Sequence, residues 1–277
     1  MNNFCFYIIS CKKNIPIVKL LIETINSNLS RKIPIYVSMD YINVPEAREN
    51  IIYIPSDSNI KFGKRMCNSL NYIKKKYIIV LCDDFIVERR IDLSEIETLI
   101  QCMENDNLIS AISLESINGK NKDEYLFPSK LACKYVLRDK YGNYKTTLQC
   151  SIWNKVAFSK LIENVNSPWE FELFSNQKSY LSENKFYALN KNYNRAIEYN
   201  RGRFVIRGKI VKPELDRLEK VLNKKIEIEG FQYTNSYEQI DEGILFKIKR
   251  RICLILKGVY YRVYSCFNEK NLNNEKI

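Results

Sequence analysis

The chain has 277 residues, a formal net charge of +12 and no histidine. This length favours one sizeable core with a tail over two domains. The missing histidine excludes Ser-His-Asp and Cys-His catalysis and every metal site that needs a histidine ligand. Acid–base chemistry must therefore come from Asp, Glu, Lys, Tyr or Cys, and a metal should be a hard cation held by carboxylates and phosphates. The positive charge favours an anionic partner, such as nucleic acid, anionic lipid or a nucleotide diphosphate.

The cysteine pattern and the N-terminus indicate a cytoplasmic protein. Nine cysteines are scattered without a CxxC pair, so neither a disulfide framework nor a zinc site is expected. The apolar patch Phe4–Ile9 has no basic region before it and no small-residue cleavage pattern after it. No stretch approaches the roughly 18 apolar residues that a membrane span needs.

The first half of the chain alternates between strand-like and helix-like segments. The expected strands are Phe4–Ser10, Pro34–Met39, Ile51–Ile54, Lys76–Phe85 and Leu108–Leu114. The expected helices are Pro16–Asn26, capped by Asn14, Gly63–Lys75, and a third that begins at the capping-box spacing of Asp92 and Glu95 and runs to about Met103. This alternation predicts a mostly parallel, doubly wound α/β sheet.

The strand Lys76–Phe85 is the most informative segment, because its apolar run ends on Asp83 and Asp84. An unbroken apolar strand is typical of the centre of a parallel sheet. Ligands of open α/β sheets bind beyond the carboxyl ends of such strands. Two acids at that position must be solvated, paired or bound to a cation. A solvated turn and a binding site are both compatible with this motif alone.

The second half changes character. A hairpin is expected from Val136 to Ile152, with its turn at Gly142-Asn143. The further expected elements are a helix at Lys155–Asn164, a helical start at Trp169, strands at Lys185–Leu189 and Phe204–Ile206, and helices at Pro213–Asn223 and Ile244–Tyr264.

Glu170 and Glu172 fall in the first turn of the helix that begins at Trp169. Acids there interact favourably with the helix dipole, which is the simpler interpretation. An acid beside Trp and Phe is also the arrangement that raises a carboxyl pKa towards that of a general base.

Gly63–Asn68, with the sequence GKRMCN, begins the helix before the acidic strand. Together with Leu81–Asp84 and Trp169–Leu173, it resembles the motifs of GT-A nucleotide-sugar glycosyltransferases, especially the family 2-like bacterial enzymes of surface polysaccharide synthesis. In that family the corresponding motifs are a Gly-Lys-x-x-x-Asn helix start, a DxD region and a later acidic motif that carries the catalytic base. Leu148–Asn154 adds to the match, and the resemblance spans roughly Phe4 to Lys209.

The resemblance implies a GT-A-like (Rossmann-like) fold and an inverting, metal-dependent glycosyltransferase. Mg²⁺ or Mn²⁺ on Asp84 would bridge the donor diphosphate. Cys82 occupies the first DxD position, so Asp84 would do this with help from Asp83. Glu170 takes the position of the base, with Glu172 as the alternative. The expected donor-binding residues are Ser10, Asp40, Lys64, Arg65, Asn68, Asp83, Arg207 and Lys209.

Simpler interpretations stand beside several of these assignments. Ser10 and Asp40 are also compatible with ordinary strand ends. Arg207 and Lys209 flank Gly208 and are equally compatible with a solvated basic turn. The implied partners are a nucleotide-diphosphate sugar donor and a glycan or lipid-linked acceptor, with no nucleic acid.

The segment from Ile244 to Tyr264 has six cations and no acid. Its cations are Lys247, Lys249, Arg250, Arg251, Lys257 and Arg262. On a helix all of them except Lys249 share one side. The apolar residues on the other side are Ile248, Ile252, Ile255, Val259 and Val263. A basic amphipathic helix suits an anionic membrane surface, so a peripheral position at the inner face of the cell membrane is expected. A helix packed on the domain with a solvated basic face is the alternative.

The expected organisation is a GT-A-like domain over residues 1–235 and a basic amphipathic tail over residues 236–277. Within the domain, residues 1–115 would bind the nucleotide and residues 116–235 the acceptor. The competing functions are a catalytically inactive relative, a basic protein that binds nucleic acid or membrane, and a glycoside hydrolase, which would need no nucleotide. A nucleotidyltransferase would usually carry a Gly-rich phosphate loop near the first strand, and this sequence has none there.

Overall fold

A computed structural model describes residues 3–117, 121–126, 133–140, 142, 144–235, and residues 252, 256, 259, 260 and 263. The helices of the first half are η1 (Lys12–Asn14), α1 (Ile15–Asn28), α2 (Phe62–Leu70) and α3 (Leu93–Asn105). Its strands are β1 (Phe4–Ile9), β2 (Ile35–Ser38), β3 (Ile51–Ile54), β4 (Tyr77–Cys82), β5 (Val87–Ile91) and β6 (Ile109–Ser113).

The second half is built of shorter elements. Its helices are α4 (Lys155–Ile162), α5 (Pro168–Glu170), the π-helical turn η3 (Phe171–Ser175), α6 (Asn176–Lys178), η4 (Ser179–Leu181) and α7 (Lys212–Leu222). Its strands are β7 (Asn121–Tyr125), β8 (Tyr135–Arg138), β9 (Ser151–Asn154), β10 (Lys185–Leu189), β11 (Ile197–Tyr199), β12 (Val205–Ile206), β13 (Lys209–Val211) and β14 (Gln232–Thr234).

Within the described residues, the central sheet has nine strands in the order β3-β2-β1-β4-β9-β6-β10-β8-β7. The first four strands pair in parallel. β9 runs antiparallel between β4 and β6, and β8 runs antiparallel to β10 and β7. Seven of the nine strands therefore point the same way, which confirms the predicted mostly parallel α/β sheet.

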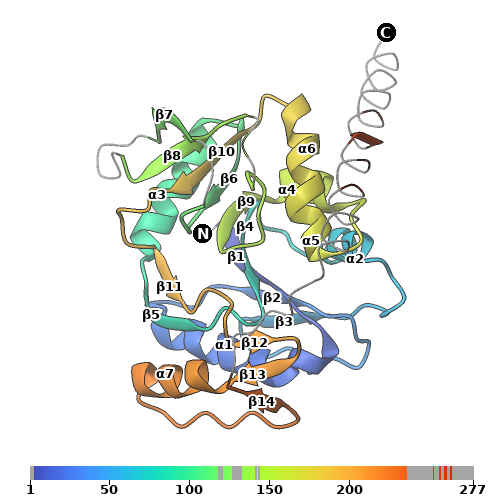
Figure 1. Cartoon of the computed structure of the whole chain (residues 1–277), viewed down its shortest axis with the longest axis vertical. Coiled ribbons are helices and arrows are strands. Elements are labelled where there is room, and N and C mark those ends of the chain that lie inside the picture. Colours follow the sequence, from blue (N-terminus) through green and yellow to red (C-terminus); the bar gives the residue numbers. More distant parts are fainter. Residues whose placement is uncertain are drawn as a thin grey trace.

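The core forms on both faces of this sheet because the buried strands alternate their side chains between the faces. One cluster joins Phe4, Phe6 and Ile8 of β1 to apolar residues of α1 and α3. The other joins Cys5, Tyr7 and Ile9 to apolar residues of α2 and α4. In Figure 1, α1, α7 and the small β12-β13-β14 sheet lie at one end of the molecule, and β7, β8 and α6 lie at the other.

The glycine of the GKRMCN segment has a packing role. Gly63 lies in α2, and its N–H donates to the carbonyl oxygen of Val165 at 2.9 Å. A Cβ at this position would overlap the carbonyl oxygen of Ile162 and lie 2.7 Å from that of Glu163. Only glycine therefore lets α2 approach the end of α4 this closely.

The hairpin predicted from Val136 to Ile152 is wrong. β8 pairs with β10 and β7, whereas β9 lies between β4 and β6. Ser151, Ile152 and Trp153 of β9 are buried, so this strand gains more by entering the centre of the sheet than by pairing locally with β8. Asn143, in the predicted turn, is outside the described residues.

Two further predictions were wrong at the ends of helices. α2 ends at Leu70, five residues before the predicted end at Lys75, and a turn at Asn71 and Tyr72 follows it. Asn14 stands at the N-cap position of α1, but its side chain makes no cap hydrogen bond. The predicted cap Asp92 does accept the backbone hydrogen bond of Glu95. Ser167, for which no capping role was predicted, caps α5 by accepting from the backbone N–H of Glu170.

Candidate active site

The carboxyl ends of β1, β2 and β4 meet at one edge of the sheet, because the three strands pair in parallel and in register. This places Ser10, Asp40 and Asp83, which follow these strands, along the same edge. Ser10 Oγ donates to Asp83 Oδ2 at 2.7 Å, and Asn14 Nδ2 donates to the same oxygen at 2.9 Å. Burial raises the pKa of Asp83, and these two hydrogen bonds act in the opposite direction. Asp83 is thus a buried carboxylate held in place by β1 and the start of α1.

Asp40 and Arg65 extend this edge on the β2 side. Asp40 Oδ1 accepts from the backbone N–H of Lys12 at 2.7 Å, and its Oδ2 lies 3.6 Å from Arg65 Nη1. Arg65 is buried, and its Nε is a buried donor without a partner in the described part of the chain. A buried guanidinium with an unused N–H beside a half-buried carboxylate is suited to holding a polar ligand.

The other two residues of the predicted helix-start motif lie elsewhere. Lys64 and Asn68 are exposed on α2. Because they are four residues apart, they share one face of this helix, and Arg65 lies on another. Lys64 lines a surface hollow with Lys61, Tyr260 and residues 163–166. The structure therefore brings Arg65, but not Lys64 or Asn68, to Asp40 and Ser10.

Asp84 is the half-buried acid at the tip of the β4 edge. Burial, and secondarily the charge of Asp83, raises its pKa to about 7. Among the residues that the structure describes, Asp84 forms no salt bridge. Ionised Asp84 is therefore short of compensating positive charge, which a bound cation would supply.

Glu172 reaches the same edge from the π-helical turn η3. Its Oε1 accepts from Thr147 Oγ1 at 3.0 Å and from the backbone N–H of Leu148 at 3.2 Å. The thiol of Cys82, at the end of β4, points at the carbonyl oxygen of Leu148, 3.8 Å away. Burial raises the pKa of Cys82 well above its usual value, and the charges of Asp84, Asp83 and Glu172 raise it further. Glu172 therefore approaches the end of β4 through Leu148, which both it and the Cys82 thiol contact.

Glu170 makes hydrogen bonds to Asn166, in a different loop from the one that Glu172 contacts. Its Oε2 accepts from the backbone N–H of Asn166 at 2.8 Å and from Asn166 Nδ2 at 2.9 Å. The neighbouring Trp169 is 75% exposed. The contacts of Glu170 therefore fix the loop that enters α5, while the indole of Trp169 lies largely in solvent.

Arg207 lies in the tight turn between β12 and β13, and Lys209 is the first residue of β13. Arg207 and Gly208 both have positive φ, 54° and 71°, as a two-residue hairpin turn requires. Lys13 Nζ donates to the carbonyl oxygen of Gly208 at 3.2 Å. This contact brings the turn beside the start of α1, next to Asn14, while the Arg207 and Lys209 side chains are exposed.

A third group of charges at this edge was not predicted from the sequence. Glu115 follows β6 and is buried, and it pairs with Arg195 Nε at 2.9 Å and with Arg201 Nε at 3.2 Å. The available signal was its position, because Glu115 follows an apolar strand just as Asp83 does. Arg195 and Arg201 come from irregular segments without a motif.

The acidic edge can supply only part of a metal's coordination. Two acceptor contacts of Asp83 are already used by Ser10 and Asn14, which leaves Asp84 as the main carboxylate. In the described parts of the chain, no cluster of three or more Cys, Asp or Glu side chains is suited to hold a metal ion. This donor set fits a hard cation such as Mg²⁺, which is commonly held by one or two carboxylates together with substrate phosphates.

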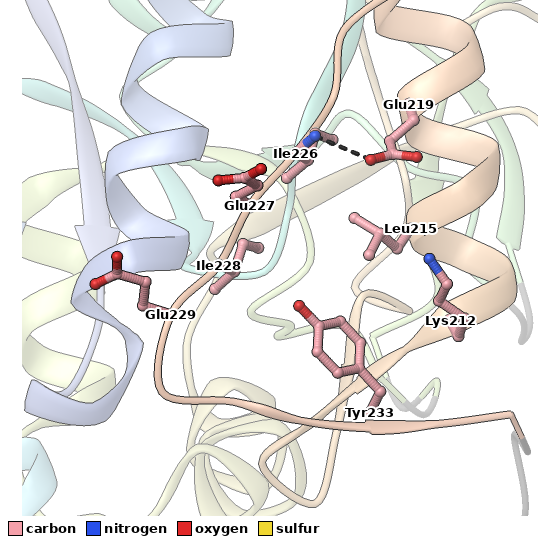
Figure 2. A pocket seen from close by; sticks show the side chains of 8 residues that line it. All are labelled: Lys212, Leu215, Glu219, Ile226, Glu227, Ile228, Glu229 and Tyr233. Atoms are coloured by element: carbon pink, nitrogen blue, oxygen red, sulfur yellow. Dashed lines mark hydrogen bonds between the residues drawn. The ribbon is translucent and has the colours of Figure 1, made fainter.

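A separate hollow of about 470 Å³ lies between α7 and the segment that leads to β14 (Figure 2). Leu215, Ile226, Ile228 and Tyr233 form its apolar lining, and Glu219 accepts a hydrogen bond from the backbone of Ile226 at 3.0 Å. None of the predicted site residues lines it. It is therefore distinct from the acidic edge.

Neither a model of a known protein family nor a curated protein matches the sequence. Among solved structures, the chain is similar to S. aureus TarS 1–349, with 11% identity and a TM-score of 0.43 over 68% of this chain and 60% of that chain. It is also similar to the bifunctional IspDF of Campylobacter jejuni, with 11% identity and a TM-score of 0.40 over 72% and 52% of the two chains. A CMP:2-keto-3-deoxy-manno-octonic acid synthetase complexed with CTP shares 12% identity, with a TM-score of 0.48 over 80% and 99%. The matched part of this chain thus spans about 60% of the TarS fragment and half of IspDF.

Proposed function

We propose that the chain is an inverting glycosyltransferase that moves a sugar from a nucleotide-diphosphate donor to a glycan or lipid-linked acceptor in surface polysaccharide synthesis. The observation that carries this proposal is that Glu172 binds the backbone N–H of Leu148, whose carbonyl oxygen faces the thiol of Cys82 at the end of β4, two residues before Asp84. Among the described residues, Asp84 lacks a compensating cation, and Glu172 comes from a separate element. A donor diphosphate beside the first and an acceptor hydroxyl beside the second would use both.

Glu172 is the better supported general base of the two acids in its segment. Its Oε1 is oriented by Thr147 and Leu148, and its Oε2 accepts no hydrogen bond from the described residues. That free oxygen can take the proton of an acceptor hydroxyl, which then attacks the anomeric carbon from the face opposite the diphosphate. Glu170 already uses its Oε2 for Asn166.

The leaving nucleotide diphosphate gains negative charge as the bond to the sugar breaks. Mg²⁺ or Mn²⁺, when bound, would supply Lewis-acid stabilisation of that charge, and Asp84 with Asp83 would hold it. Ser10 and Asn14 keep Asp83 oriented. Asp40 and Arg65 offer a carboxylate and a guanidinium to the nucleoside part of the donor.

A thermal-shift screen tests the donor class. UDP, GDP, ADP, CDP and dTDP are each added to the full chain, with and without Mn²⁺. One of them is expected to raise Tm, because a ligand at 100 times its Kd stabilises the folded state by about 2.7 kcal/mol. No shift with any of these nucleoside diphosphates, with or without Mn²⁺, would contradict the proposal.

We also propose that the C-terminal segment holds the enzyme at an anionic membrane surface. Most of residues 236–277 lie outside the described residues. The described ones include Ile252, Leu256, Val259 and Val263, which are helical, share one helix face by their spacing and are between 50% and 65% exposed. Six cations without an acid lie in the surrounding sequence. Exposed apolar side chains among cations match an interface of acyl chains and anionic headgroups. Among the described residues, no helix is long and apolar enough to cross a bilayer.

The double variant L256E/V259E is expected to lower binding to vesicles containing phosphatidylglycerol by tenfold or more, because each glutamate replaces an inserting apolar side chain and opposes the lipid charge. Vesicle co-sedimentation measures this. Val221→Glu is the matched control, since it changes an exposed valine on α7. Undiminished binding by the double variant, or equal binding of the wild type to neutral phosphatidylcholine vesicles, would contradict the membrane assignment.

A further inference from the structure

Glu115 is a buried carboxylate that faces two guanidinium groups. It is 6% exposed, and its Oε2 lies 2.9 Å from Arg195 Nε. Arg201 also reaches it, with Nε 3.2 Å from Oε2 and Nη2 3.4 Å from Oε1. One carboxylate neutralises only one guanidinium, so this group keeps a net positive charge. Such a surplus beside an acidic edge is suited to an anionic ligand.

The backbone of Arg201 is fixed directly beside Asp84. Arg201 and Gly202 both have positive φ, 60° and 65°, and form a tight turn. A Cβ on Gly202 would lie 2.6 Å from the ring of Phe85 and 3.4 Å from Asp84 Oδ2. The turn is anchored before this contact, because the backbone N–H of Asn200 donates to the carbonyl oxygen of Ile86 at 3.1 Å. The Arg201 side chain therefore starts one residue away from the contact with Asp84, the carboxylate that would carry the donor diphosphate.

Arg195 is held by more contacts than Arg201. The Arg195 side chain is 16% exposed, donates to the carbonyl oxygen of Tyr199 at 3.2 Å and stacks on the Tyr199 ring. The Arg201 side chain is 52% exposed, and Glu115 is its one hydrogen-bonding side-chain partner among the described residues. If Arg201 leaves, Glu115 stays paired with Arg195. Breaking a buried ion pair is usually costly because one charge is left without a partner. Here that cost does not arise, because Arg195 remains as the partner of Glu115.

We infer that Arg201 is a diphosphate-binding residue that exchanges its partner, from Glu115 in the free protein to the β-phosphate of the nucleotide when the donor binds. This inference rests on the proposed function, because it places the donor diphosphate at Asp84. The guanidinium matches two phosphate oxygens as it matches two carboxylate oxygens, and a phosphate offers more charge than a shared carboxylate. Arg201 would thereby neutralise the leaving group alongside the cation on Asp84.

The test compares a nucleoside diphosphate with its monophosphate in the presence of EDTA. The diphosphate is the one that stabilises the wild type most among UDP, GDP, ADP, CDP and dTDP, and calorimetry gives both Kd values. Arg201→Asn is expected to weaken diphosphate binding by about 10- to 100-fold, the range for a lost hydrogen bond to a charged group, and to leave monophosphate binding unchanged. Asparagine tolerates the left-handed backbone at this position, so the turn is kept. Arg203→Asn, at an exposed position of the same loop, is the matched control and should keep the wild-type ratio.

The possible results distinguish a failure of the proposed Arg201 role from a failure of the proposed function. Loss of diphosphate preference in Arg201→Asn alone supports the exchange. An unchanged ratio in Arg201→Asn overturns the role of Arg201 and leaves the proposed function standing. A wild-type chain that binds none of the five diphosphates, with or without Mn²⁺, overturns both. Arg201→Lys tests whether the guanidinium makes two hydrogen bonds to the phosphate. A diphosphate affinity between those of Arg201→Asn and the wild type indicates bidentate contact by the arginine.

Discussion

Glu172→Gln is expected to reduce sugar transfer by about 10²- to 10⁴-fold, the usual contribution of a general base, while the chain stays folded. Glutamine keeps an oxygen for Thr147 and Leu148, which bind Oε1 in the wild type. It cannot take a proton from the acceptor. The expected defect is therefore in kcat, with little change in donor affinity. Steady-state transfer assays with the donor named by the thermal-shift screen measure both.

Glu170→Gln is the matched control for this substitution, since it makes the same chemical change two residues away. Its carboxylate binds Asn166 at the entry to α5. We expect a modest loss of stability and near-normal transfer from the folded fraction. The reverse result, with Glu170→Gln inactive and Glu172→Gln active, would return the base to the position that the family resemblance assigns.

The parallel half of the fold could be predicted because its signals are local. The β1, β2, β3 and β4 strands are short apolar runs separated by helical periodicity, and each was found to within two residues at its ends or, for β4, three. The β9 strand could not be placed, because its position between β4 and β6 depends on pairing with residues 38 to 77 positions away. The short strands β5, β11, β13 and β14 were missed, because strands of three to five residues are too short to establish a period of two in the sequence.

The site was predictable to the extent that sheet topology determines it. Ser10, Asp40 and Asp83 follow parallel strands, and the structure brings them together for that reason. The choice between Glu170 and Glu172 was not predictable, since it depends on which carboxylate meets the loop at Thr147. Asn14 was expected to cap α1, yet its side chain binds Asp83. That contact joins residues far apart in the sequence, which no local pattern reveals.

Asp84→Asn is expected to abolish transfer and, at the same time, to make the metal-free chain more stable at neutral pH. The activity is lost because the amide carries no charge to hold Mg²⁺ or Mn²⁺ at the diphosphate. The stability rises because the wild-type chain keeps a half-buried carboxylate that forms no salt bridge among the described residues. Few inactivating substitutions of surface acids would stabilise the protein, so this combination is diagnostic of a binding residue kept at a cost in stability.

The stability difference between Asp84→Asn and the wild type should depend on pH, and the raised pKa of Asp84 determines its direction. Asp84 has a pKa raised from 3.8 to about 7, by burial and then by Asp83. Below pH 3.8 the folded and unfolded chains both carry the protonated acid, and no stability is lost. Between pH 3.8 and 7 the unfolded chain ionises first, so wild-type stability falls as pH rises, by on the order of a few kcal/mol at pH 7 and above. Asparagine does not titrate, so the advantage of the variant should grow from pH 4 to pH 7 and then stay constant.

Thermal unfolding in EDTA at several pH values between 4 and 8 measures this advantage, and Asp57→Asn is the control because it removes an exposed carboxylate. The difference in Tm between Asp57→Asn and the wild type should not change with pH. Adding Mn²⁺ with the nucleoside diphosphate should narrow the gap at pH 8, because the ligand stabilises the wild type through Asp84 and has no such contact in the variant. A pH-independent difference between Asp84→Asn and the wild type would show that Asp84 is already compensated in the free protein. The need for a cation at this edge would then lose its physical basis.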